Sequence, residues 1–201
     1  MDSKKNQISQ LLDQQEEKFF NDYWDTYKRI LFKSKDNEKF VQIKKVFKQV
    51  SQDGGKIIFV GNGASASLAS HAATDLTKQG KIKSIALNDH NLITALSNDY
   101  GYEKWVEKAI EFYADEGDNV ILISAGGNSP NMVNGAKQSK KKKIGKIITF
   151  TGNDKNNNLS KLGDINFWVN SKAYNHIENV HQILLLSLVD LIIGKTEYPP
   201  N

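Results

Sequence analysis

The sequence predicts an α/β protein: a five-stranded parallel sheet flanked by helices, preceded by a long N-terminal helical extension. Short apolar segments alternate with helical ones from residue 56 onward, which is typical of a parallel sheet with helices on both faces. Two of these segments end in turns rich in Gly, Ser and Asn. Apolar residues at helical spacing fill the start of the chain. We therefore expect residues 1–54 to form helices for oligomer packing and residues 55–201 to form the α/β sandwich.

The N-terminal extension reads as two amphipathic helices. The first spans about residues 5–34 and repeats apolar side chains at helical intervals: Ile8, Leu11, Leu12, Phe20, Tyr23, Trp24, Tyr27 and Leu31. The second carries apolar side chains from Phe40 to Val50, and Gly54-Gly55 ends it. Their aromatic face is broader than one small domain can cover, so we expect part of it to be a subunit interface.

Five apolar segments are predicted as strands. They are residues 56–60, 82–87, 119–124, 146–151 and 165–169. The chain closes with a predicted helix from about Asn175 to Ile193. No repeat, linker or shift in composition marks a boundary, so a single domain over residues 1–201 is expected.

Bulk composition points to a cytoplasmic globular protein. The 201 residues include no cysteine, which excludes disulfides and thiolate metal sites and fits a reducing compartment. The N-terminus lacks the apolar core of a signal peptide, and Ser187 and Asp190 interrupt the apolar run near the C-terminus, so no membrane span is expected. The net charge of +4 is spread along the chain. Its one basic block, Lys140 to Lys143, ends a predicted helix and fits a solvated surface better than a nucleic-acid site.

The turn after the first strand has the composition of an anion site. Gly61-Asn62-Gly63-Ala64-Ser65 leads directly into a helix. Glycine allows close backbone approach, Asn62 and Ser65 supply hydrogen bonds, and a helix N-terminus offers free N–H groups. Open α/β sheets bind ligands at such turns. The alternative is a tight turn in which Ser65 only caps the helix.

A dinucleotide site is a chemical rival for the same turn. Gly61, Gly63 and Ala66 match the loose G-x-G-x-x-G/A spacing, and Asp89 follows the second strand as a candidate ribose ligand. This match is weak, and it leaves the second polar turn unexplained.

The second polar turn follows the third predicted strand. Residues 124–131 read Ser-Ala-Gly-Gly-Asn-Ser-Pro-Asn, and Pro130 suits the first turn of a helix. Two such turns on one sheet are better explained by a shared phosphate ligand than by helix capping alone, which remains the alternative.

At these turns the sequence resembles the SIS (sugar isomerase) domain family, and within it the phosphoheptose isomerases. The resemblance covers nearly the whole chain, including the long N-terminal helix. Its markers are Gly61 to Ser65, His71 with Asp75-Leu76-Thr77, Asn98 to Tyr102, Ser124 to Ser129, Thr151 to Asp154, and Glu178 to His181. The resemblance implies one SIS domain, a homotetramer, and conversion of D-sedoheptulose 7-phosphate to D-glycero-D-manno-heptose 7-phosphate. That reaction is the first step towards activated heptose for surface polysaccharide, including lipopolysaccharide.

The same resemblance implies the site residues. The substrate and its phosphate would be held by Asn62, Gly63, Ser65, Asp99, Ser124, Asn128 and Ser129. His71 and Asp75, which share a helix face at i, i+4, would be a metal ligand and a catalytic, metal-binding carboxylate. Glu178 could serve as a base or as a third metal ligand, and His181 could supply a catalytic imidazole. His and carboxylate ligands suit Zn²⁺, the expected cofactor.

Four positions depart from the family pattern. The family has glutamate at Asp75, glutamine at Glu178, a catalytic histidine at Leu186, and a second phosphate-loop serine at Gly126. These departures leave two functions open. One is the isomerase, which needs a base together with an acid or a metal. The other is a non-catalytic SIS protein that senses a sugar phosphate or acts as an adaptor, for example a tetramer that associates with a replication initiator.

Overall fold

The structure of the protein, a computed structural model, describes residues 13–32 and 36–199. The chain divides into two compact units, Met1–Lys35 and Asp36–Asn201. Residues 5–12 of the first predicted helix lie outside the described residues.

The boundary between the units differs from the predicted one after residue 54. Helix α3 (Asn37–Gln52) belongs to the unit that contains the sheet. Its Ile43, Phe47 and Val50 are buried in the hydrophobic core against the strands. Amphipathic spacing in the sequence shows that such a face exists, but it does not show which surface covers the face.

The first unit contains helix α2 (Gln14–Phe32). Asp13 starts it, because its carboxylate accepts hydrogen bonds from two backbone amides of the first turn at 2.7 and 2.9 Å. The predicted aromatic face is present and open: Phe19, Phe20 and Trp24 are 59%, 42% and 54% exposed. Its expected role in oligomer packing stays a prediction.

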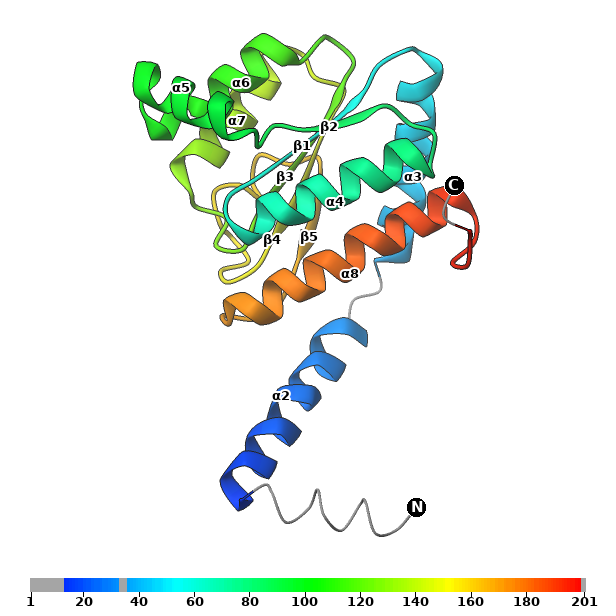
Figure 1. The fold of residues 1–201 in the computed structure, drawn as a ribbon, viewed down its shortest axis with the longest axis vertical. Coiled ribbons are helices and arrows are strands. Elements are labelled where there is room, and N and C mark those ends of the chain that lie inside the picture. Colours follow the sequence, from blue (N-terminus) through cyan, green and yellow to red (C-terminus); the bar gives the residue numbers. More distant parts are fainter. Residues whose placement is uncertain (1–12, 33–35, 200–201) are drawn as a thin grey trace. The chain divides into compact units, whose positions relative to one another are not determined.

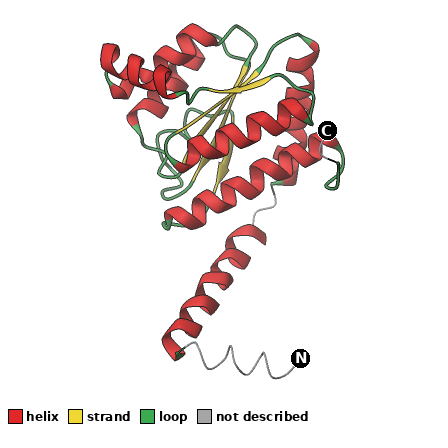
Figure 2. Ribbon diagram, viewed as in Figure 1, coloured by secondary structure: helices red, strands yellow, loops and turns green. Residues whose placement is uncertain are grey.

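The second unit is an α/β sandwich (Figure 1 and Figure 2). After α3 the elements are β1 (Ile57–Gly61), α4 (Ala64–Lys78), β2 (Ser84–Ala86), α5 (His90–Tyr100), the short 3-10 helix η1 (Tyr102–Lys104), α6 (Trp105–Tyr113), β3 (Asn119–Ser124), α7 (Pro130–Lys141), β4 (Lys146–Thr151), β5 (Ile165–Trp168) and α8 (Tyr174–Ile193). All five strands are parallel, in the order β2-β1-β3-β4-β5. The predicted fold class is confirmed.

Side chains of the central strands alternate between two cores. Phe59 on β1 and Ile121 on β3 point to the core formed with α3, α4 and α8. Ile58 and Val120, one position earlier on the same strands, point to the core formed with α5, α6 and α7. Figure 1 shows these two helical layers on either side of the sheet. Because both faces are covered, the strands are apolar throughout.

The second strand is shorter than predicted. Four strands match their predicted segments to within one residue at each end, but β2 covers only Ser84–Ala86 of residues 82–87. As an edge strand, β2 pairs with β1 alone. Ile82 belongs to the preceding turn instead, since its amide donates to the carbonyl of Leu76 at 3.2 Å.

Helix α8 is long and apolar enough to span a membrane by length and composition alone. Its apolar residues nevertheless pack into the core of the sandwich: Ile177, Val180, Leu185, Leu188, Val189 and Ile192 are buried. This packing identifies α8 as a core helix.

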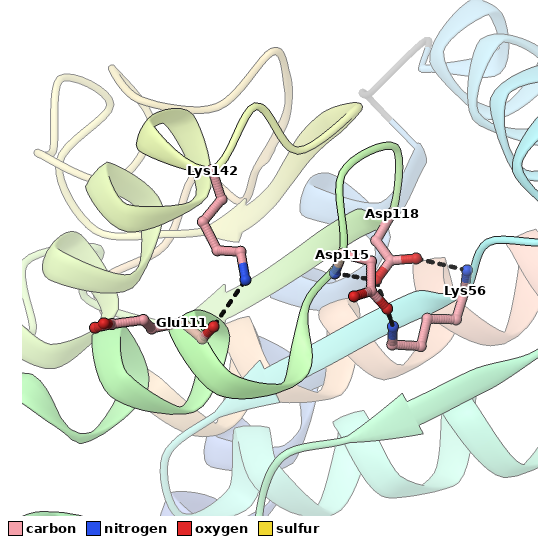
Figure 3. A network of polar contacts seen from close by, with 5 residues as sticks. All are labelled: Lys56, Glu111, Asp115, Asp118 and Lys142. Carbon is pink, nitrogen blue, oxygen red and sulfur yellow. Dashed lines mark hydrogen bonds and ion pairs between the residues drawn. The ribbon is translucent and has the colours of Figure 1, made fainter.

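An ion network, in which only Asp118 is fully buried, holds together the amino ends of β1 and β3 (Figure 3). Lys56 Nζ lies 2.6 Å from a carboxylate oxygen of Asp118 and 2.7 Å from one of Asp115. Burial acts to lower the pKa of Lys56, but hydrogen bonds to Asp115 and Asp118 raise it above its usual value. Nearby, Lys142 Nζ donates to the carbonyl of Glu111 at 2.7 Å and ties α7 to α6. The amino end of the sheet therefore has a structural role. The polar turns lie at the other end, where the strands finish.

Candidate phosphate-binding site

The two polar turns lie at the same edge of the sheet. β1 and β3 are neighbouring parallel strands, and Gly61 is in register with Ile123. The chain leaves β1 through Asn62 and Gly63 into α4, and it leaves β3 through residues 125–129 into α7. Because parallel strands end at a common edge, the turns are neighbours in space.

A pair of amide side chains joins the two turns. Asn131 Nδ2 donates to Asn62 Oδ1 at 2.9 Å, and Asn62 Nδ2 donates to Asn131 Oδ1 at 3.1 Å. The hydroxyl of Tyr102, on η1, also donates to Asn62 Oδ1 at 3.4 Å. Asn62 is partly exposed and keeps a second N–H for a ligand. Asn131 was not among the predicted site residues, and its place at the end of the second turn was the only signal for it in the sequence.

The first turn keeps a hydroxyl that the chain itself does not use. Gly63, with φ 55°, is the N-cap of α4, and no side chain caps this helix. A Cβ at Gly61 would lie 2.5 Å from the backbone of Ser65, so glycine is needed for α4 to start this close to β1. Ser65 is 3% exposed, and within the described part of the chain its hydroxyl has no hydrogen-bond partner. The alternative in which Ser65 only caps α4 is therefore wrong.

The second turn is braced by the loop that follows β4. Ser124 Oγ accepts the amide of Gly127 at 3.1 Å, and the carbonyl of Gly127 accepts the amide of Leu159 at 2.9 Å. Gly127 has φ 65°, and a Cβ there would overlap the side chain of Asn157. These contacts fix the backbone of the turn and leave the O–H of Ser124 able to donate to a ligand.

The last two side chains of this turn are also available. Ser129 is the N-cap of α7, but its side chain makes no capping bond, and Pro130 after it has no N–H to cap. Asn128 is exposed, and its Oδ1 accepts the amide of Asn158 at 3.0 Å, which leaves its NH₂ group outward. Helix capping alone does not explain these residues.

The donors at this edge of the sheet are neutral. Residues 61–67 and 124–131 contain no Lys or Arg. The groups at this edge that could bind a ligand are the hydroxyls of Ser65, Ser124 and Ser129 and the positive ends of the α4 and α7 dipoles. Helix N-termini with hydroxyl and amide donors bind phosphate groups. The arrangement suits a phosphate ester.

A second polar group lies further along α4. His71 Nε2 is 3.1 Å from Asp75 Oδ2, and Gln182 Nε2 on α8 donates to His71 Nδ1 at 3.1 Å. Since Nδ1 accepts this bond, the proton of the neutral ring is on Nε2 and points to Asp75. The side chains of His71 and Asp75 are 51% and 29% exposed. The arrangement orients a carboxylate that a substrate could reach. The sequence analysis did not place Gln182 in the site.

The predicted metal site is not assembled within one chain. In residues 13–32 and 36–199, no three His, Asp or Glu side chains gather closely enough to hold a metal ion. His71 and Asp75 form a pair, but Glu178, partly exposed on α8, does not complete a set with them. The donors of a single chain therefore fall short of a Zn²⁺ site.

His181 is a core residue, which corrects its predicted catalytic role. Its side chain has no exposed surface, its ring packs edge-on to Phe150 at 5.8 Å, and its Nε2–H donates to the carbonyl of Thr151 at 3.1 Å. Burial lowers the pKa of His181 to about 4, against the smaller effect of the bond to Thr151. A fully buried imidazole has no surface with which to contact a substrate.

Two further aspartates have local roles. Asp99, predicted to contact the sugar, lies exposed in the last turn of α5, and across the described ranges the only hydrogen-bond partner of its side chain is Asn98, at 2.9 Å. Asp89, the ribose ligand of the dinucleotide alternative, caps α5 by accepting the amides of Asn91 and Leu92 at 3.0 and 3.1 Å. The carboxylate that the dinucleotide site would need for the ribose is therefore used to cap α5.

Residues 18–152 match the SIS domain family, and the chain belongs to that family. The similar proteins include phosphoheptose isomerases. The chain is 34% identical to that of Aliarcobacter butzleri over 162 residues, covering 77% of this chain and 84% of the relative. It is 35% identical to that of Helicobacter hepaticus over 150 residues, covering 72% and 76%.

Solved structures agree with the sequence relatives. The phosphoheptose isomerases of Francisella tularensis and Neisseria gonorrhoeae share the fold with TM-scores of 0.81 and 0.79 and identities of 25% and 26%. Each match covers 89% of this chain and 98% of the other. The resemblance to the phosphoheptose isomerase subgroup is confirmed.

Proposed function

We propose that the protein is a phosphosugar isomerase that converts D-sedoheptulose 7-phosphate to D-glycero-D-manno-heptose 7-phosphate. The observation that carries the proposal is the joined pair of turns, in which the hydroxyls of Ser65 and Ser129 have no hydrogen-bond partner among residues 13–32 and 36–199. A phosphate ester supplies acceptors for these hydroxyls. The identities of 34% and 35% with phosphoheptose isomerases support this substrate.

The isomerisation moves one proton between neighbouring carbons. In the open-chain ketose, Asp75 takes a proton from C1, a C1–C2 double bond forms, and the electron pair of the C2 carbonyl moves to its oxygen. Glu178 then carries the O1 proton to O2, the C1 carbonyl forms, and Asp75 returns its proton to C2. His71 holds the carboxylate of Asp75 in place throughout.

The geometry of α4 favours a homo-oligomeric enzyme. Asp75 follows Ser65 by ten residues, roughly 15 Å along the helix axis, which is longer than an extended heptose. In the proposal, carboxylates of one subunit complete the phosphate site of another. The exposed aromatic side chains of α2 offer apolar surface for packing such a tetramer. The enzyme would work in the cytoplasm and feed heptose into lipopolysaccharide synthesis.

We also propose that the same carboxylates bind a Zn²⁺ ion. His71, Asp75 and Glu178 would hold it once subunits assemble, with the amide of Gln182 turned so that its oxygen accepts Nδ1–H of His71 and Nε2 is free for the metal. A bound Zn²⁺ would supply positive charge that stabilises the negative oxygen of the enediolate. Asp75 and Glu178 would carry out the proton transfers.

The direct test is turnover of sedoheptulose 7-phosphate by the purified full-length protein, with the aldose product separated by chromatography. Asp75→Asn removes the base, so kcat should fall by about 100-fold or more. Glu116→Gln, a matched change at an exposed carboxylate in the loop before β3, should leave kcat unchanged. Binding without turnover, with and without added Zn²⁺, would instead favour the non-catalytic sensor or adaptor.

A further inference from the structure

Gly126, in the second turn, is a glycine that its own backbone does not require. Its φ lies outside the left-handed region, and a Cβ there would meet only the hydroxyl of Tyr174, at an ordinary contact distance of 3.8 Å. Gly127 differs, because its φ is 65° and a Cβ would overlap Asn157. Gly126 is also partly exposed. The backbone and the surroundings of Gly126 would therefore accept a side chain.

The hydroxyl of Tyr174 lies at this open position. Tyr174 is the first residue of α8 and is 61% exposed, and in the part of the chain that the structure describes its hydroxyl has no hydrogen-bond partner. The first turn of α8 is held here by close packing, since a Cβ at Gly152 would lie 2.6 Å from Ile177 Cδ1. The amide of Gly152 in turn donates to the carbonyl of Ala125 at 3.0 Å. The position of Tyr174 thus follows from the packing of α8 on the end of β4.

We propose that Tyr174 binds the phosphate group of the substrate through its hydroxyl, in the place that a side chain at Gly126 would otherwise take. A phenol is a neutral O–H donor, of the same kind as the hydroxyls of Ser124 and Ser129 on the same turn. Its exposed ring would also shield one side of the phosphate from water, which strengthens the hydrogen bonds beneath it. This inference rests on the proposed function only in requiring that the turns hold a phosphate.

The test compares Tyr174→Phe, which removes one oxygen atom, with the parent protein. Calorimetric titration with inorganic phosphate and with sedoheptulose 7-phosphate should show about tenfold weaker binding, the loss expected for one hydrogen bond to a charged ligand. The KM should rise by a similar factor with kcat unchanged, because the hydroxyl contacts the phosphate and not the reacting carbons. Tyr113→Phe, at an exposed tyrosine on the opposite edge, should have no effect.

A second variant tests the relation between the two positions. Gly126→Ser places a hydroxyl on the turn itself, so adding it to Tyr174→Phe should restore most of the lost affinity. Unchanged phosphate binding by Tyr174→Phe, or no recovery in the double variant, would overturn the inference. If Tyr174→Phe weakens phosphate binding in a protein without isomerase activity, the inference stands and the proposed function fails. If Tyr174→Phe keeps the parent KM and the parent phosphate affinity in a protein with isomerase activity, the inference fails and the proposed function stands.

Discussion

Replacing Asn131 with alanine should loosen the phosphate site and lower the stability of the whole unit. Asn131 is 1% exposed and makes three hydrogen bonds: two with Asn62, at 2.9 and 3.1 Å, and one in which its Oδ1 accepts the amide of Met132 at 3.0 Å. Each such bond contributes about 1 kcal/mol, so Asn131→Ala should cost about 3 kcal/mol. For a chain of this size the melting temperature should fall by roughly 6–12 °C.

A double-mutant cycle measures the bridge itself. Urea unfolding of Asn62→Ala, Asn131→Ala and the double variant should give a coupling energy of about 1–2 kcal/mol, because each single change removes the same two bonds. Asn134→Ala is the matched control on the same helix, since its side chain makes one bond, to the carbonyl of Glu103 at 2.9 Å. Phosphate affinity should fall with Asn131→Ala and not with Asn134→Ala. Additive effects, or equal costs for Asn131 and Asn134, would show that the pair of Asn62 and Asn131 does not hold the two turns together.

Two further predictions concern His181 and the glycines of the second turn. The pKa of His181 is about 4 in the folded chain and near 6.5 when unfolded, so as pH falls the unfolded chain takes up the proton first. The free energy of unfolding should therefore be highest above pH 6.5 and drop by about 3 kcal/mol towards pH 4. His181→Gln should flatten this slope in urea titrations, and an unchanged slope would contradict the assignment. Gly127→Ala should cost about 2 kcal/mol or more through strain at φ 65° and overlap with Asn157, whereas Gly126→Ala should be nearly neutral by the same measurement.

The sheet could be predicted because its signals are local. Residues 119–124 and 146–151 are apolar runs bounded by polar or turn residues, and the structure has β3 and β4 at these positions. Strand β2 was predicted less well, because an edge strand with three residues carries little apolar pattern.

The error at His181 has a specific cause. Helix α8 is apolar on most of its surface, so helical periodicity does not reveal which side faces the sheet. His181 directly follows Val180, and the packing of α8 buries both. His181 was predicted to substitute for the catalytic histidine that the family has at Leu186, and the sequence did not show that its side chain faces the core.

The parallel sheet and the chemical character of its two turns can be predicted from the sequence, because strand patterns and Gly, Ser and Asn turns depend on neighbouring residues. Which groups are available to a ligand depends instead on the three-dimensional packing. The bond between Asn62 and Asn131 joins residues 69 positions apart, and the approach of Tyr174 to Gly126 depends on how α8 packs. Such contacts are set by the packing of distant segments, which no local pattern records.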